Sequence, residues 1–201
     1  MFLVDKLKYE RELNEEGYKF VCGVDEVGRG PLAGPVVCAA VIMPLDDILE
    51  GVDDSKKLSA KKREALSELI MKKAVAYRIC LIEPEIIDEI NILEATKLCM
   101  KNAVESLQIK PDYVLTDGNM TLDISVPQKS IVKGDSLSYS IGAASIIAKV
   151  YRDALMDEYD KLYPAYGFAK HKGYGTAAHI KAIKEAGICP VHRRSFTKKW
   201  H

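Results

Sequence analysis

Apolar positions along the chain fall into short continuous runs and into stretches with helical spacing. Residues 18–24 and 35–43 are Val-rich runs joined by a glycine-rich turn, which predicts two neighbouring strands. Further short apolar runs predict strands at residues 75–82, 113–116 and 130–132. The chain therefore supplies several strands for one sheet.

Helical spacing separates these runs. Residues 59–73 begin with Ser59 and carry apolar positions three and four apart, which predicts a helix. Residues 84–107 predict a short helix followed by a longer one, residues 136–162 a long amphipathic helix before Pro164, and residues 176–186 a last helix. Strands and helices in this order indicate an α/β or α+β layered domain with a mixed sheet.

Composition agrees with one folded domain spanning residues 1–201. The chain has 201 residues, 48% hydrophobic and 29% charged, which excludes a disordered, collagen-like or disulfide-scaffold protein. No apolar run approaches the roughly 20 residues needed to cross a bilayer, and the N-terminus turns charged after four residues. We therefore expect a cytoplasmic protein without membrane contact, whose five cysteines are reduced thiols in the core.

Charge is unevenly distributed although the net charge is zero. Residues 161–201 contain nine Lys and Arg against one acid, Glu185, whereas the rest of the chain is acidic. We interpret residues 161–201 as a basic segment that contacts a polyanionic substrate, with a solvated surface as the alternative. Residues 1–17 are a lead-in to the first strand.

Carboxylates stand where three predicted strands end. Asp25 and Glu26 follow the first run directly, Asp117 follows residues 113–116, and Asp135 follows residues 130–132. Neighbours in a regular strand point to opposite faces, so we expect the backbone to leave β geometry at Asp25 and Glu26, as the following glycines permit.

Four carboxylates brought together would repel one another and raise one another's pKa unless cations neutralised them. Oxygen-only ligands suit two divalent ions, Mg²⁺ or Mn²⁺, and do not suit zinc. Two such ions about 3.5 to 4 Å apart can clamp the attacking and leaving oxygens of a phosphodiester hydrolysis. Acids at strand ends also cap turns, and the spacing alone favours neither interpretation.

Three short segments are candidates for phosphate or nucleic-acid contact. The loop Gly28-Arg29-Gly30, called the G-R-G loop below, allows close backbone approach and adds a permanent charge at Arg29. Lys56, in Asp-Ser-Lys-Lys, is a possible phosphate contact or a solvated helix lead-in. Tyr174, in His-Lys-Gly-Tyr-Gly, can stack on a sugar or base, or fold back onto the core.

The stretch G-V-D-E-V-G-R-G-P-L-A-G-P-V closely resembles the opening signature of the ribonuclease HII family. Seven further motifs follow in family order: D-S-K at 54–56, N-I-L-E-A-T at 91–96, T-D-G at 116–118, K-G-D at 133–135, A-A-S-I-I-A-K-V-Y-R-D at 143–153, H-K-G-Y at 171–174 and H-R-R-S-F at 192–196. The resemblance covers roughly residues 18–197, and eight ordered motifs are far more specific than any one.

The resemblance implies an RNase H-like fold: a mixed five-stranded sheet flanked by helices, with a small helical C-terminal part. It implies an endoribonuclease that hydrolyses the RNA strand of RNA/DNA hybrids and cuts 5′ of single ribonucleotides in duplex DNA, leaving 5′-phosphate and 3′-OH ends. By the family pattern Asp25 bridges two ions, Asp135 serves the ion that activates water, and Glu26 and Asp117 serve the ion at the leaving oxygen. The G-R-G loop would contact the ribonucleotide 2′-OH, and Tyr174 would pack against the ribose.

Departures from the family pattern are small. Val27 stands where the family commonly has Ala. The five residues after Phe196 leave no room for the C-terminal helices or clamp-binding tails of some relatives, so no clamp partner is assigned. Roughly 17 residues before the first strand are too few for the extra domain of ribonuclease HIII. We expect a monomer acting in DNA replication and repair, with Asp153 in a surface ion pair.

Two other functions stay open. A non-enzymatic module would bind nucleic acid through the basic segment without metal or turnover. A two-metal nuclease that ignores the ribose would also cut all-DNA duplexes. The G-R-G loop and Tyr174 favour ribose-dependent cutting over both.

Overall fold

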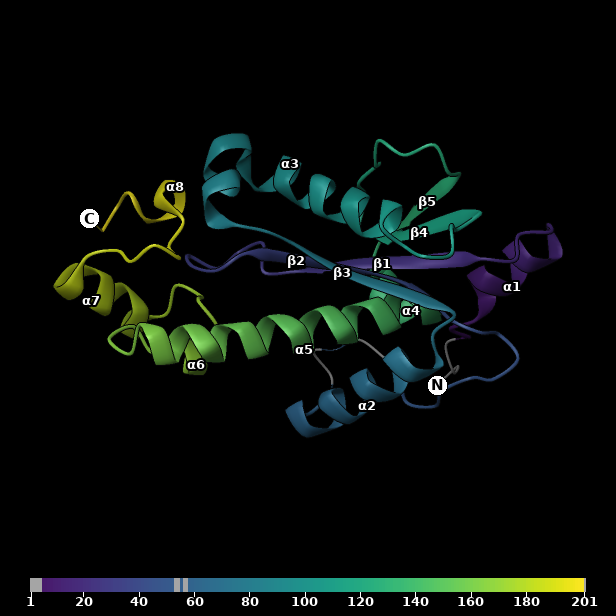
Figure 1. Cartoon of the computed structure of the whole chain (residues 1–201), viewed down its shortest axis with the longest axis horizontal. Helices are drawn as coiled ribbons and strands as arrows, with labels where there is room; N and C mark the ends of the chain where they lie inside the picture. Colours follow the sequence, from purple (N-terminus) through teal and green to yellow (C-terminus); the bar gives the residue numbers. More distant parts are fainter. Residues whose placement is uncertain (1–4, 53–54, 56–57, 201) are drawn as a thin grey trace.

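The computed structural model describes residues 5–52, 55 and 58–200, and its centre is one five-stranded sheet (Figure 1). The strands are β1 (Val21–Val27), β2 (Val36–Ile42), β3 (Ala76–Ile82), β4 (Tyr113–Asp117) and β5 (Gln128–Ile131). Their order is β3-β2-β1-β4-β5, with β1 parallel to β4, β4 parallel to β5, and the other pairs antiparallel. The expected mixed five-stranded sheet is confirmed.

Helices cover both faces of this sheet and both ends (Figure 1). They are α1 (Lys8–Glu15), α2 (Ala60–Lys73), α3 (Pro84–Glu105), α4 (Gly134–Leu137), α5 (Tyr139–Leu162), α6 (Phe168–His171), α7 (Ala177–Ala186) and α8 (Arg194–Thr197). Helix α3 lies on one face, and α5 with α2 lies on the other. Because both faces are covered, every residue of β2 is buried, which explains its unbroken apolar sequence.

Most predicted elements are confirmed, with shifted ends. The helix predicted over residues 84–107 is broken at Asn91, whose φ of 67° is left-handed, so the expectation of a short and then a longer helix is correct. The long helix starts at Tyr139 instead of residue 136, because the Ser138 hydroxyl accepts from the Ile141 N–H as an N-cap. The sequence pattern did not predict α1, α4, α6 and α8, of which the last three span four residues each.

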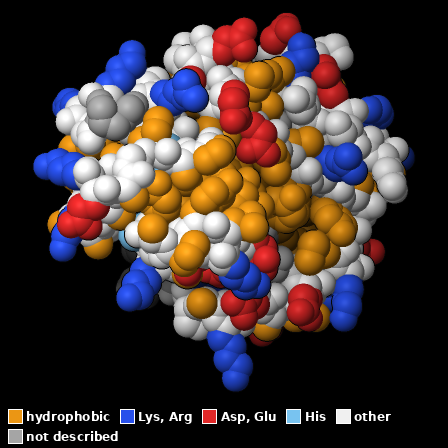
Figure 2. Space-filling view, turned by 60° about the vertical axis from the view of Figure 1, so that its left-hand side comes forward, with side chains coloured by type: hydrophobic (Ala, Val, Ile, Leu, Met, Phe, Trp, Pro, Cys, Tyr) orange, Lys and Arg blue, Asp and Glu red, His pale blue; other side chains and the backbone are white. Residues whose placement is uncertain are grey.

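The C-terminal helices form a separate small core beside the end of the sheet. Leu32, Met156, Phe168 and Ile183 are among its buried residues. Figure 2 brings this end forward and shows apolar side chains gathered over its middle, with Lys, Arg, Asp and Glu around them. Within the described chain, no helix is both long and apolar enough to cross a membrane.

Candidate active site

Three neighbouring strands bring the predicted carboxylates to one edge of the sheet. Asp25 and Glu26 lie near the end of β1, and Asp117 is the last residue of β4, which runs parallel to β1. Asp135 lies in α4, which follows β5, the other neighbour of β4. Carboxyl ends of parallel strands meet at the same edge, which is where open α/β sheets bind their ligands. These residues are called the four carboxylates below.

The expectation that the backbone leaves β geometry at Asp25 and Glu26 is wrong. The strand continues to Val27, with Asp25 opposite Ala39 and Glu26 opposite Cys38 of β2. Ala39 belongs to the core under α5 and Cys38 to the core under α3, so the two acids point to opposite faces. Pairing with β2 keeps the strand regular through both positions.

Burial and mutual repulsion disfavour negative charge on this pair. Asp25 is 5% exposed, and its pKa is raised well above its usual value by burial and by the nearby Glu26 and Asp117. Burial likewise raises the pKa of Glu26 to about 7, against the opposing effect of the Arg29 guanidinium, which lies 3.4 Å from Oε1. Oε2 of Glu26 is buried without a hydrogen-bond partner in the described structure. Positive charge is therefore deficient at this edge.

A tight turn holds Asp117 next to Asp135. Oδ1 of Asp117 accepts a hydrogen bond of 2.6 Å from the Gly134 N–H, and a longer one from the Asp135 N–H. The turn needs a left-handed Lys133, with φ of 60°. A Cβ at Gly134 would lie 2.7 Å from Ile141 and 3.3 Å from Asp117, so only glycine lets this turn approach β4 so closely.

The four carboxylates have the donor atoms that a divalent cation prefers, but their side chains are not arranged as a complete coordination site. Within the described residues, no group of three or more His, Cys, Asp or Glu side chains is arranged to hold a metal ion. Their donor atoms are nevertheless all carboxylate oxygens, the pKa values of Asp25 and Glu26 are raised, and one oxygen of Glu26 is unpartnered. Hard ions such as Mg²⁺ and Mn²⁺ prefer this donor set.

The G-R-G loop and Tyr174 lie together, as the resemblance implies. A Cβ at Gly30 would lie 3.7 Å from the Tyr174 ring, and the Leu32 N–H donates to the Gly173 carbonyl at 2.8 Å. Tyr174 is 44% exposed, so its ring is not folded into the core. Arg29 connects the loop to the four carboxylates through Glu26. Lys56 lies outside the described residues.

Several polar residues around the site were missed by the sequence analysis. Ser145 of α5 donates to Asp25 and contacts Ser55 at 3.0 Å between hydroxyl oxygens. Arg152 and Arg193 lie buried behind the G-R-G loop. Arg152 had a readable signal, because it interrupts an otherwise apolar series, Ala144, Ala148 and Met156, on the buried stripe of α5. Asp153 pairs with Lys149 at 2.6 Å, as expected.

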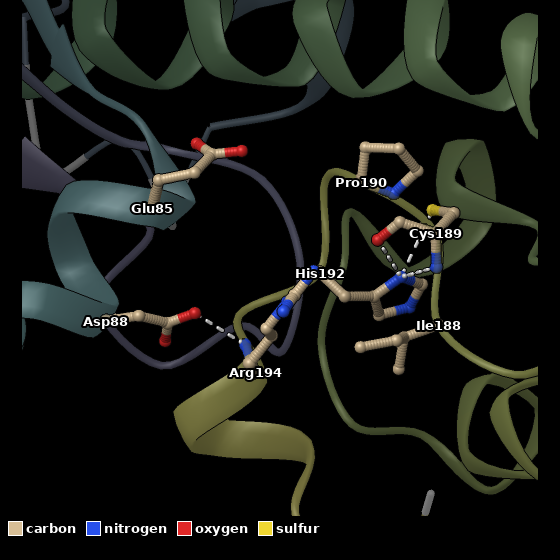
Figure 3. Close-up of a pocket in the computed structure, with 7 residues that line it drawn as sticks. All are labelled: Glu85, Asp88, Ile188, Cys189, Pro190, His192 and Arg194. Atoms are coloured by element: carbon tan, nitrogen blue, oxygen red, sulfur yellow. Dashed lines mark hydrogen bonds between the residues drawn. The ribbon is translucent and has the colours of Figure 1, made fainter.

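A cavity of about 460 Å³ lies apart from the four carboxylates, where the N-terminal end of α3 meets the segment before α8 (Figure 3). Its lining includes Asp88, Cys189, His192 and Arg194. Asp88 accepts from the Arg194 N–H at 2.7 Å, and the Cys189 sulfur lies 3.1 Å from Nδ1 of His192. Neither the four carboxylates nor the G-R-G loop nor Tyr174 lines this cavity, although part of its lining lies in the basic segment at residues 161–201.

The chain is similar to ribonucleases H of type 2 in sequence and in structure. The family model described as Ribonuclease HII matches residues 22–199. Ribonuclease HII of Caldicellulosiruptor saccharolyticus is 55% identical over 197 residues, covering 97% of this chain and 96% of that protein.

Two solved structures share the fold, each with a TM-score of 0.76. Ribonuclease H2 of Pyrococcus horikoshii is 29% identical and covers 90% of this chain and 96% of its own. The ribonuclease HII solved in a PCNA complex from Archaeoglobus fulgidus is 28% identical, covering 89% and 94%. The RNase H-like fold is confirmed. The chain belongs to the ribonuclease HII family, and it is a metal-dependent endoribonuclease that acts on RNA/DNA hybrids.

Proposed function

We propose that this ribonuclease cuts 5′ of single ribonucleotides in duplex DNA as well as within RNA/DNA hybrids, leaving 5′-phosphate and 3′-OH ends. The contact between Arg29 and Glu26 carries the proposal, because it connects the loop that would read the sugar to the carboxylates that would serve the scissile phosphate. A ribonucleotide held against Tyr174 and the G-R-G loop would present its neighbouring phosphate to this edge of the sheet.

Asp25, Glu26, Asp117 and Asp135 would hold two divalent cations, Mg²⁺ or Mn²⁺. When bound, the ions would supply an activated water and charge stabilisation at the leaving oxygen. Ser145 orients Asp25, and the turn at Gly134 orients Asp117. Arg29 contacts Glu26 and would also contact the substrate strand. It would thereby fix the position of the sugar relative to the carboxylates.

The G-R-G loop and Tyr174 would distinguish ribose from deoxyribose. The 2′-OH is both donor and acceptor, and it is the one group that separates RNA from DNA at a given site. The loop offers peptide N–H groups at close range, and the exposed Tyr174 ring offers a flat apolar surface for the sugar.

An end-labelled DNA duplex with one ribonucleotide tests the proposal. We expect a single metal-dependent cut 5′ of the ribonucleotide, no cut in EDTA, and no cut in the all-DNA duplex. Cutting of all-DNA would remove the ribose-reading role and leave the metal site. Binding without cutting, with either Mg²⁺ or Mn²⁺, would contradict the proposed site.

Other expectations from the sequence stay predictions. They are the single domain over residues 1–201, the substrate-contacting role of residues 161–201, the monomeric state, the cytoplasmic location, and a role in removing ribonucleotides during DNA replication and repair. Lys56 stays a predicted phosphate contact.

A further inference from the structure

Two buried cations lie behind the G-R-G loop, and the proposed reaction uses neither of them. Arg152 of α5 and Arg193, the residue before α8, are both fully buried. Burial lowers the pKa of Arg152 to about 10 and that of Arg193 to about 9, the latter helped by repulsion from Arg152. Both side chains therefore stay charged at neutral pH. A buried charge is costly unless polar partners compensate for it.

Peptide carbonyls of the loop provide this compensation for Arg193. Its Nη1 donates to the Arg29 carbonyl at 2.8 Å, and its Nη2 donates to the Gly28 carbonyl at 2.5 Å. Nε and Nη2 both donate to the Gly34 carbonyl, at 3.0 and 2.8 Å. Hydrogen bonds from an ionised donor are stronger than neutral ones. One guanidinium thus joins the G-R-G loop to Gly34.

Arg152 holds the next part of the chain and attaches it to the segment before Tyr174. It donates to the carbonyls of Ala33 at 3.1 Å, Pro35 at 3.0 Å and Lys172 at 2.9 Å. A Cβ at Gly28 would lie 2.1 Å from Nε of Arg152, so the loop packs directly on this side chain. The two guanidinium groups therefore join the G-R-G loop and residues 172–174, called the Tyr174 segment below, into one unit.

The carbonyl contacts also determine where the loop's N–H groups point. The C=O of one residue and the N–H of the next share a planar trans peptide and point in opposite directions, and the described residues include no cis peptide. The Gly28 and Arg29 carbonyls face Arg193. The N–H groups of Arg29 and Gly30 must therefore point away from it, and Gly30 lies on the side of the exposed Tyr174 ring.

We infer that Arg152 and Arg193 are positioning residues for ribose recognition, which aim the Arg29 and Gly30 peptide N–H groups and the Tyr174 segment at the 2′-OH of the substrate. This inference rests on the proposed function. It requires the planar five-donor guanidinium and not merely a positive charge. A lysine at position 193 would keep the charge but could not hold the Gly28, Arg29 and Gly34 carbonyls together.

The variant Arg193→Lys tests the inference, with Arg11→Lys as control, since Arg11 is an exposed arginine paired with Asp5 and lies outside the basic segment. The readouts are kcat/KM on the single-ribonucleotide duplex and the inhibition constant of the same duplex in all-DNA form. We expect Arg193→Lys to lower kcat/KM about tenfold, the effect of one misdirected hydrogen bond, and to leave the inhibition constant unchanged. Arg11→Lys should change neither.

Three other results would overturn the inference that Arg152 and Arg193 position the loop. An unchanged kcat/KM in folded Arg193→Lys, or a parallel weakening of all-DNA binding, would overturn the inference. If thermal unfolding shows that Arg193→Lys is unfolded at the assay temperature, Arg152→Lys is judged by the same two readouts. Loss of folding in both would also overturn it, since the residues would then serve the fold as a whole. A wild-type enzyme that does not cut this duplex would instead contradict the proposed function.

Discussion

The two charged regions of this molecule are built in opposite ways. At the sheet edge, Asp25 and Glu26 are buried near Asp117, their pKa values are raised, and one Glu26 oxygen has no partner in the described structure. Behind the G-R-G loop, Arg152 and Arg193 are fully buried, yet their donors are met by peptide carbonyls. One region lacks compensation for its charge, and the other has it.

The two regions should therefore differ before substrate binds: the first needs added positive charge, and the second is already held in place. Asp25 and Glu26 are costly to hold ionised, so a divalent cation bound as proposed would stabilise the four carboxylates. The loop and the Lys172 carbonyl before Tyr174 are already held by charge-assisted hydrogen bonds, so the proposed sugar recognition would be preorganised. Substitutions should therefore affect activity most at the carboxylates and stability most at the loop.

The largest effect is expected for Asp117→Asn. Asparagine retains an Oδ1 that accepts from the Gly134 N–H, so the turn and the fold should persist. The lost charge should lower kcat about a thousandfold, the upper range for removing one electrostatic contact to the transition state. Single-turnover cleavage of the single-ribonucleotide duplex measures it. Asp123→Asn, an exposed acid paired with Lys101, is the control. If Asp117→Asn retained more than a tenth of wild-type activity, Asp117 would not belong to the active site.

The next largest effect separates the two glycines of the loop. In Gly28→Ala the new Cβ would lie 2.1 Å from Nε of Arg152, at a left-handed φ of 93°. Arg152 is pinned by three carbonyls and cannot move aside. We expect a loss of about 3 kcal/mol in unfolding free energy, measured by urea denaturation.

Gly30→Ala is the matched control, because its Cβ would make an ordinary contact of 3.7 Å with Tyr174. Its stability should stay within about 0.5 kcal/mol of the wild type, while cutting at single ribonucleotides falls because the substrate can no longer approach the backbone. Equal stability losses in both variants would show that the loop is not supported by Arg152.

The sequence was more informative about the carboxylates than about the residues that support the loop. All four acids could be named because each follows an apolar run, and the break at Asn91 was readable from the helical spacing. Strand geometry at Asp25 and Glu26 was misjudged because the glycines after them suggested a break, whereas pairing with β2 decides it. The role of Arg193 could not be read, since its partners Gly28 and Arg29 are more than 160 residues away in sequence and all are peptide groups.

A smaller effect is expected from adding Mg²⁺ or Mn²⁺ to the metal-free protein. Binding to the folded state alone, at a hundredfold excess over Kd, stabilises by about 2.7 kcal/mol and should raise the Tm by roughly 5 °C or more. Asp25→Asn should abolish this rise and should increase the Tm in EDTA, because a buried charge is removed. Scanning calorimetry with and without metal measures both. An Asp25→Asn protein that still gains the full rise would exclude Asp25 as a ligand.

The smallest effect is the pH dependence of stability in EDTA, where Glu26 at the sheet edge and His179 next to Tyr174 should act in opposite directions. The folded-state pKa of Glu26, about 7, exceeds its unfolded value near 4.5, so the folded state binds more protons and stability rises as pH falls through this interval. His179 behaves oppositely. It donates toward the Tyr174 carbonyl and contacts His192, and burial lowers its pKa, so stability is complete above about 6.5 and is lost as pH falls below it.

Two variants separate these contributions. Urea denaturation between pH 5 and pH 8 should show that Glu26→Gln removes the rise at lower pH, leaving a protein that only loses stability on acidification. His179→Gln should remove the loss and leave the rise. If both variants follow the wild-type profile, Glu26 and His179 are not the groups that titrate, and the uncompensated burial of Glu26, on which the contrast between the two regions depends, does not affect stability.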